Sequence, residues 1–235
     1  MTEKHSLVLI PGLLCTGDLW RDQIDALDDI ANITVADHTR DDTVPAIASR
    51  LLSEAPERFA LAGLSMGGYI ALEVMRQAPE RVTHLAIMDS RAIADTPEEG
   101  QRRLDFINLV EKGSAFKGVT RSLLPILIHP SRLEDEELTD RIFKMAEDVG
   151  KEAFIRQERA LLAREVLWDV LKTISCPTLV LSGADDKLIP ASVQREMAVE
   201  IPTAQYVEIP ECGHLPTMEE PEITSKYMRH WLARS

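Results

Sequence analysis

A serine in the first third of the chain stands in a pattern that suits nucleophilic catalysis. Ser65 is the centre of GLSMG over 63–67, the pattern Gly-x-Ser-x-Gly. The pattern follows a strand-like run, FALAGL, and precedes a stretch of helical period, MGGYIALEVMRQAPE. A serine at such a turn projects its hydroxyl from the edge of a sheet, and only glycine fits beside so tight a turn. Ser65 is therefore the candidate nucleophile.

One of the six histidines stands where a general base for this serine is needed. A serine hydroxyl is a weak nucleophile until a base takes its proton, and a third group must fix the tautomer of that base. His214 follows the last strand-like run, in IPECGHLPTMEEPE, and so lies at the same sheet edge as Ser65. The remaining histidines fit this chain order less well: His5, His38, His84, His129 and His230.

Two adjacent aspartates follow another strand-like run and are candidates for that third group. PTLVLSG leads into ADDKLIP, which places Asp185 and Asp186 at the edge that should hold Ser65. Aspartate is also favoured in turns and at helix N-caps, so either residue has a structural explanation. The residues alone leave both open as the acid that orients His214. Asp89, at the end of LAIMD, is the reserve candidate because it should lie at the same edge.

Two backbone N–H groups are expected to bind the oxyanion that such a reaction develops. One is the N–H of Met66, directly after Ser65. The other should come from IPGLLCTG after the first strand, where Gly12 turns the chain back and Leu13 or Leu14 presents its amide.

The elements that position these groups are visible as short apolar runs that alternate with segments of helical period. Runs that are apolar on both faces suit strands buried in a parallel sheet. The predicted strands cover 6–10, 32–37, 59–64, 82–88, 177–183 and 204–209. The alternation predicts an α/β fold with a doubly wound, mainly parallel six-stranded sheet.

The alternation breaks once, from about Arg91 to Trp168, where amphipathic stretches contain no convincing strand. We interpret 91–168 as a helical cap inserted after the fourth strand, and 1–90 with 169–235 as the core. The cap has more apolar residues than a solvent-facing helix needs, which indicates either a lid that lines a pocket over Ser65 or a cap packed against itself. The candidate pocket residues are Leu14, Trp20, Phe106, Leu124, Leu127 and Trp168.

Composition excludes several classes of function. With 235 residues, 45% of them hydrophobic, the chain can bury the core of one large domain. A net charge of −13 offers no basic surface, so we expect neither nucleic-acid nor membrane binding. The apolar run near the start is too short for a signal peptide, and three widely spaced cysteines indicate a reducing compartment. We therefore expect a cytoplasmic protein.

Together the motifs resemble the α/β-hydrolase superfamily over nearly the whole chain. GLSMGG resembles the nucleophile elbow of that family, LSGADDKLIP its acid loop, GHLPTMEEPE its histidine loop and LVLIPGLL its oxyanion loop. The resemblance implies Asp186 as the acid, three residues after Gly183, and Leu13 with Met66 as the oxyanion donors. In place of the usual His-Gly of the oxyanion loop, Pro11 precedes the glycine, which weakens the assignment to an esterase subfamily.

The resemblance further implies a carboxylesterase-type serine hydrolase. It would form an acyl-enzyme on Ser65 from a small-molecule acyl substrate, with no metal and no organic cofactor. A C–C bond hydrolase, a thioesterase or lactonase, and a perhydrolase use a similar arrangement, and a non-catalytic receptor for a small ligand can retain it. The fold does not choose among these functions.

Overall fold

The computed structural model describes residues 4–113 and 116–235 and contains one six-stranded sheet. The strand order is β2-β1-β3-β4-β5-β6, and every neighbouring pair is parallel. The strands are β1 (His5–Ile10), β2 (Ala31–Val35), β3 (Phe59–Leu64), β4 (Val82–Met88), β5 (Thr178–Gly183) and β6 (Ala204–Ile209). The predicted α/β sheet is confirmed, and it is parallel throughout. The second strand ends two residues earlier than the sequence suggested.

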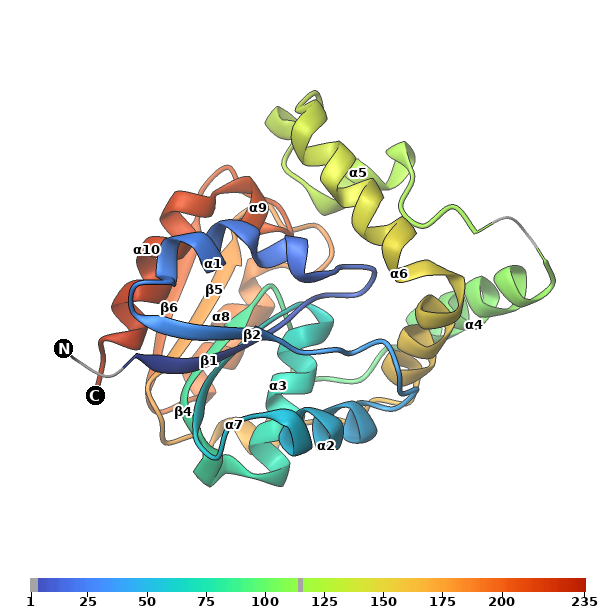
Figure 1. The fold of residues 1–235 in the computed structure, drawn as a ribbon. Helices are drawn as coiled ribbons and strands as arrows, with labels where there is room; N and C mark the ends of the chain where they lie inside the picture. Colours follow the sequence, from blue (N-terminus) through green and yellow to red (C-terminus); the bar gives the residue numbers. More distant parts are fainter. Residues whose placement is uncertain (1–3, 114–115) are drawn as a thin grey trace.

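Helices cover both faces of this sheet (Figure 1). The helices of the sheet region are η1 (Gly17–Trp20), α1 (Arg21–Leu27), α2 (Val44–Glu54), α3 (Met66–Gln77), η2 (Pro79–Arg81), α8 (Ala191–Glu200), α9 (Pro216–Glu219) and α10 (Pro221–Leu232). Helices α1, α9 and α10 pack in one hydrophobic cluster, and α2, α3 and α8 pack in the other. Along β1, Leu7 and Leu9 join the first cluster while Val8 and Ile10 join the second. Because both faces are buried, the strands are apolar at successive positions.

Helices follow one another between β4 and β5, and no strand occurs there among the described residues. They are α4 (Pro97–Glu111), η3 (Arg121–Leu123), α5 (Leu124–Leu127), η4 (Pro130–Arg132), α6 (Glu136–Leu162) and α7 (Trp168–Leu171). Figure 1 shows α4, α5 and α6 beyond the carboxyl ends of the strands. Residues 1–3 of the expected core and 114–115 of the expected cap lie outside the described residues. Within the described ranges, no helix combines the length and the apolarity needed to cross a bilayer.

A cluster of ion pairs lies within this inserted segment, and one of its arginines packs against α3. Asp95 accepts from Arg103 at 2.7 Å and from Arg164 at 2.5 Å, and Arg103 also reaches Glu158 of α6 at 2.6 Å. The Arg164 guanidinium lies 4.4 Å from the ring centroid of Tyr69 in α3. Burial lowers the pKa of Arg164 to about 10. Because a buried charge without its partner is costly, the cluster holds α4 and α6 in one arrangement on the core.

The approach of α3 to β1 requires a glycine at position 67. A Cβ there would overlap the carbonyl oxygen of Ile10, at the end of β1. We expect Gly67→Ala to lower the free energy of unfolding by about 1–3 kcal/mol, measured by urea denaturation. Gly100→Ala is the matched control, because the nearest atom to its Cβ is Leu162 Cδ1 at 3.4 Å. Inside α4, three residues after Pro97, it should add about 0.5–1 kcal/mol, and equal effects of the two changes would contradict the packing described.

Candidate active site

Ser65 occupies the turn between β3 and α3. Its φ of 55° and ψ of −114° lie in a region that costs a non-glycine residue about 1–3 kcal/mol. A Cβ on Gly63 would overlap the carbonyl group of Gly67, so the turn closes this tightly only with glycine. The Ser65 N–H donates to the carbonyl of Met88 at 2.9 Å, and the residue remains partly exposed. The serine therefore stands at the carboxyl end of β3.

Strained backbone is concentrated at this edge of the sheet. Four non-glycine residues among those described have positive φ: Leu14 (60°), Ser65 (55°), Asp89 (42°) and Glu211 (53°). They follow β1, β3, β4 and β6, each at the carboxyl end of its strand. Backbone strain of this kind persists where the surrounding structure holds it and clusters at functional sites. The edge is thus the candidate active site.

His214 and Asp186 form a buried pair at the same edge. Nδ1 of His214 lies 2.8 Å from Oδ2 of Asp186, and the two side chains are 4% and 0% exposed. The other carboxylate oxygen, Oδ1, accepts the N–H groups of Leu188 at 2.8 Å and Ile189 at 3.0 Å. Burial opposes ionisation of Asp186, but the charge of His214 and these hydrogen bonds outweigh it and lower the pKa of the carboxyl.

Asp185, the other aspartate that the sequence left open, faces a different histidine. Its carboxylate lies 3.8 Å from Nε2 of His129, and its side chain is half exposed. Of the two neighbours, Asp186 is the one that contacts His214. Asp89 is also close, because Asp89, Asp186 and His214 each have a polar side-chain atom within 4.8 Å of the others.

A buried glutamate holds the loop around His214. Oε2 of Glu219 accepts the N–H groups of Gly213 at 3.0 Å and His129 at 2.7 Å, and Oε1 accepts the N–H of Leu215 at 3.0 Å. Burial raises the pKa of Glu219, and the three backbone donors oppose that rise. Both neighbours of His214 are therefore fixed by one side chain. No pattern in the sequence singles out Glu219, since nothing in MEEPE distinguishes it from the glutamate that follows.

The loop after β1 runs directly beside the serine. A Cβ on Gly12 would lie 3.4 Å from Cβ of Ser65. The N–H of Leu14 donates to Oε1 of Gln157 at 3.2 Å, whereas the N–H of Leu13 has no acceptor in the part of the chain that the structure describes. Met66 begins α3, and the first N–H groups of a helix have no acceptor within it. Leu13 and Met66 therefore both offer amides that have no acceptor among the described residues.

Two buried polar side chains tie this loop to the inserted helices. Gln157 of α6 has no exposed surface, and its Nε2 lies 3.0 Å from Nε2 of His38. The same His38 nitrogen lies 2.9 Å from the carbonyl oxygen of Gly12. Burial lowers the pKa of His38, which favours the neutral ring. The sequence offered no signal for this contact, because His38 and Gln157 are 119 residues apart.

The candidate pocket residues lie in different surroundings. Trp20 and Leu124 are buried in the cluster with α1 and α10, and Leu127 packs against that cluster. Trp168 packs against the opposite cluster, Leu14 is partly buried, and Phe106 is half exposed on α4. Leu127 reaches the histidine loop, because its carbonyl accepts the N–H of His214 at 2.9 Å.

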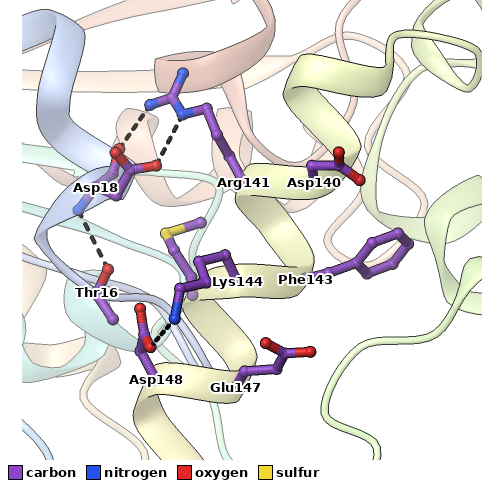
Figure 2. Close-up of a pocket in the computed structure, with 9 residues that line it drawn as sticks. Thr16, Asp18, Asp140, Arg141, Phe143, Lys144, Glu147 and Asp148 are labelled. Carbon is purple, nitrogen blue, oxygen red and sulfur yellow. Dashed lines mark hydrogen bonds and ion pairs between the residues drawn. The ribbon is translucent and has the colours of Figure 1, made fainter.

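A surface cavity of about 720 Å³ lies between the segment before α1 and helix α6 (Figure 2). Most of the charged side chains that line it form ion pairs: Arg141 donates to Asp18 at 2.8 Å, and Lys144 contacts Asp148 at 2.5 Å. None of the candidate catalytic side chains lines it. We therefore place the candidate active site elsewhere, at the carboxyl edge of the sheet.

The grouping of Asp89, Asp186 and His214 is also close enough to surround a cation. However, Nδ1 of His214 bonds Oδ2 of Asp186, and Oδ1 of each aspartate accepts a backbone N–H. The arrangement is that of hydrogen-bonded carboxyl groups and an imidazole. Such a pair can hold a histidine in one tautomer, with its second ring nitrogen left to exchange a proton.

Comparisons with known proteins agree with this architecture. The model of the Alpha/beta hydrolase family matches residues 7–226. A Klebsiella variicola protein with the provisional name carbamate hydrolase RutD is 30% identical over 227 residues, which cover 88% of this chain and 84% of that protein. The pimeloyl-[acyl-carrier protein] methyl ester esterase of Vibrio campbellii is 24% identical, over 97% of this chain and 94% of that protein. A thermophilic esterase from Thermogutta terrifontis has a TM-score of 0.87 and 28% identity, over 98% of this chain and 90% of that one.

The contact between Gln157 and the loop after β1 can be tested without an activity assay. In Gln157→Ala the partly buried N–H of Leu14 loses its acceptor, which should lower the free energy of unfolding by about 1–3 kcal/mol. The exchange of the Leu14 amide hydrogen should also become faster. Gln101→Ala is the control, because Gln101 bonds only an exposed neighbour, Asp105, and should change stability by less than about 0.5 kcal/mol. Unchanged exchange at Leu14 in Gln157→Ala would contradict the contact.

Proposed function

This chain belongs to the alpha/beta hydrolase family and is a hydrolase, and from that premise we propose that it cleaves a small-molecule carboxylic ester through an acyl-enzyme on Ser65. The observation that carries the proposal is the buried contact of 2.8 Å between His214 and Asp186. It leaves Nε2 of His214 as the nitrogen that exchanges the proton of Ser65. The esterases of V. campbellii and T. terrifontis support an ester as the substrate class.

Each side chain has one role in the proposed reaction. Asp186 accepts a hydrogen bond from the protonated Nδ1 of His214, which keeps Nε2 unprotonated before the reaction. The carboxylate also stabilises the imidazolium that forms when His214 takes a proton. His214 takes the proton of Ser65 as Oγ attacks the ester carbonyl, and then gives it to the leaving alcohol. Water then attacks the acyl-serine, and His214 takes its proton in the same way. The acid product leaves, and Ser65 regains its proton. These steps use only groups of the chain, with neither metal nor organic cofactor.

The oxyanion of the tetrahedral intermediate is proposed to bind the amides of Leu13 and Met66. Donors fixed beside the reacting carbon supply a large part of the rate acceleration in acyl transfer. The position of Gly12 beside Ser65 supports a donor from this loop. The hydrogen bond of Leu14 to Gln157 supports Leu13 rather than its neighbour.

The inserted segment, 91–168, is proposed to act as a cap that shapes the acyl pocket. It touches the loops that hold the proposed catalytic groups: Leu127 bonds His214, the carbonyl of Pro125 accepts from Lys187 at 2.9 Å, and Gln157 bonds Leu14. Binding of a small acyl substrate there, and not of nucleic acid or a membrane, stays a proposal, as does the cytoplasmic location.

Hydrolysis of a carbamate is a second candidate, favoured by the similarity to the K. variicola protein. Carbamate cleavage needs the same nucleophile, base and oxyanion donors, so the leaving group and the pocket decide between the two substrates. We expect a higher kcat/KM for short-chain p-nitrophenyl esters than for p-nitrophenyl carbamates with acyl groups of equal length. The reverse order would make the carbamate the substrate class.

Replacement of the proposed nucleophile should remove hydrolysis and leave the fold. Ser65→Ala should lower kcat for p-nitrophenyl acetate by about 10³-fold or more, because the acyl-enzyme cannot form. The native circular dichroism spectrum should be retained. Ser53→Ala, in α2, is the control and should keep most of the activity, because Ser53 is exposed and its hydroxyl bonds only the carbonyl of Arg50. Labelling by a sulfonyl fluoride at a residue other than Ser65 would contradict the assignment.

A further inference from the structure

Asp89 is a buried carboxyl group beside the proposed catalytic acid. It follows β4 and has no exposed surface. Its Oδ1 accepts the N–H of Gly183 at 2.9 Å and the side-chain amide of Gln194 at 3.3 Å. The orientation of Gln194 is fixed, because its own oxygen accepts the N–H of Ser90 at 3.2 Å. Oδ1 of Asp89 is therefore an acceptor from two donors.

The other oxygen of Asp89 has no such partner. Oδ2 is buried, and no donor reaches it from the described residues. A carboxylate oxygen of Asp89 lies within 4.8 Å of one of Asp186, whose two oxygens together accept from Leu188, Ile189 and His214. Two buried carboxyl groups so close to one another cannot both be charged, so one of them keeps a proton. The proton belongs on the carboxyl with fewer donors, which is Asp89, and on its unpartnered oxygen.

We propose that Asp89 is a positioning residue: its Oδ2–H donates a hydrogen bond to Asp186, and the two carboxyl groups carry one negative charge that rests on Asp186 beside His214. No bond to substrate is involved. Asp89 acts on the reaction only through the carboxylate that orients the imidazole. The effect of Asp89 on the rate rests on the proposed function, whereas its effect on stability does not.

The electrostatic surroundings of Asp89 agree with this assignment. Burial and the neighbouring charge of Asp186 raise the pKa of Asp89 well above its usual value. Asp186 and His214 each have a polar atom within 4.8 Å of a carboxylate oxygen of Asp89, and burial raises the pKa of the Cys212 thiol, which keeps that group neutral. His214 bonds Asp186 directly. The imidazole therefore has its acceptor in Asp186 and needs no charge on Asp89.

The segment that holds Asp89 also contacts the proposed nucleophile. Ser90 Oγ donates to the carbonyl of Ser65 at 2.7 Å, and a Cβ on Gly68 would press against Ser90.

Asp89 has a positive φ of 42°, which asparagine adopts as readily as aspartate. Asparagine can therefore replace it without a change of backbone, and its amide can donate to Asp186 as the protonated acid does.

The rate arm of the test compares Asp89→Asn with Asp89→Ala and Asp186→Asn. Asp89→Asn keeps a donor to Asp186, so kcat for p-nitrophenyl acetate should stay within about threefold of wild type. Asp89→Ala removes the donor and should lose about 10- to 100-fold in kcat with little change in KM. Asp186→Asn should lose about 10³-fold or more. Asp185→Asn, on the same loop, is the control for activity.

The stability arm measures unfolding of wild type and Asp89→Asn between pH 4 and pH 8. Folded wild type keeps a proton that the unfolded chain releases above about pH 4, so wild type should lose stability relative to the variant as pH rises. The unfolding equilibrium constant of wild type, divided by that of the variant, should rise about tenfold per pH unit until the folded carboxyl titrates. This arm remains valid if Asp89→Ala fails to fold.

The two arms separate the possible failures. A ratio that stays flat or falls between pH 4 and pH 8 would overturn the protonated state of Asp89. A loss of activity in Asp89→Asn as large as that in Asp186→Asn would show that a negative charge at Asp89 is needed, and would also overturn the proposal. If instead Ser65→Ala retains full activity, the proposed function fails while the stability arm still tests Asp89.

Discussion

The common direction of the six strands is the constraint on which the site depends. In a parallel sheet every strand ends at the same edge, so loops distant in sequence meet there. Ser65 follows β3, Asp89 follows β4, Asp186 follows β5 and His214 follows β6. The helices must then cross back over one face or the other, which buries both faces and requires apolar residues along the strands. The site and the core thus follow from the same topology.

Buried polar groups at this edge are compatible with folding because nearly all of them have partners. Asp186 has three donors, and Glu219 has three backbone donors around the histidine loop. An unpaired group in such a place would cost the free energy of its desolvation. Beside His214 and Asp186, Oδ2 of Asp89 has no partner among the described residues, and the proposed proton on that oxygen would provide one. The hydrogen-bond inventory therefore indicates a protonation state.

The inserted helices contact the loops of the candidate site. Gln157 holds the amide of Leu14, and Leu127 holds the amide of His214. The ion pairs around Asp95 fix α4 and α6 against α3, the helix that begins directly after Ser65. These contacts position the loop beside the serine and the loop of the histidine.

The sequence by itself determined the six strands, the helical segment between β4 and β5, and the chain order of Ser65, an aspartate after the fifth strand and His214, because apolar periodicity and glycine at a tight turn are local signals. The residues alone did not separate Asp186 from Asp185, which have the same type and nearly the same place. Only the tertiary structure showed Asp186 against His214 and Asp185 against His129. It alone also identified Gln157 and Glu219, whose partners are remote in sequence or are backbone groups. Burial and pairing of polar side chains are set by packing between distant segments, and no local pattern encodes them.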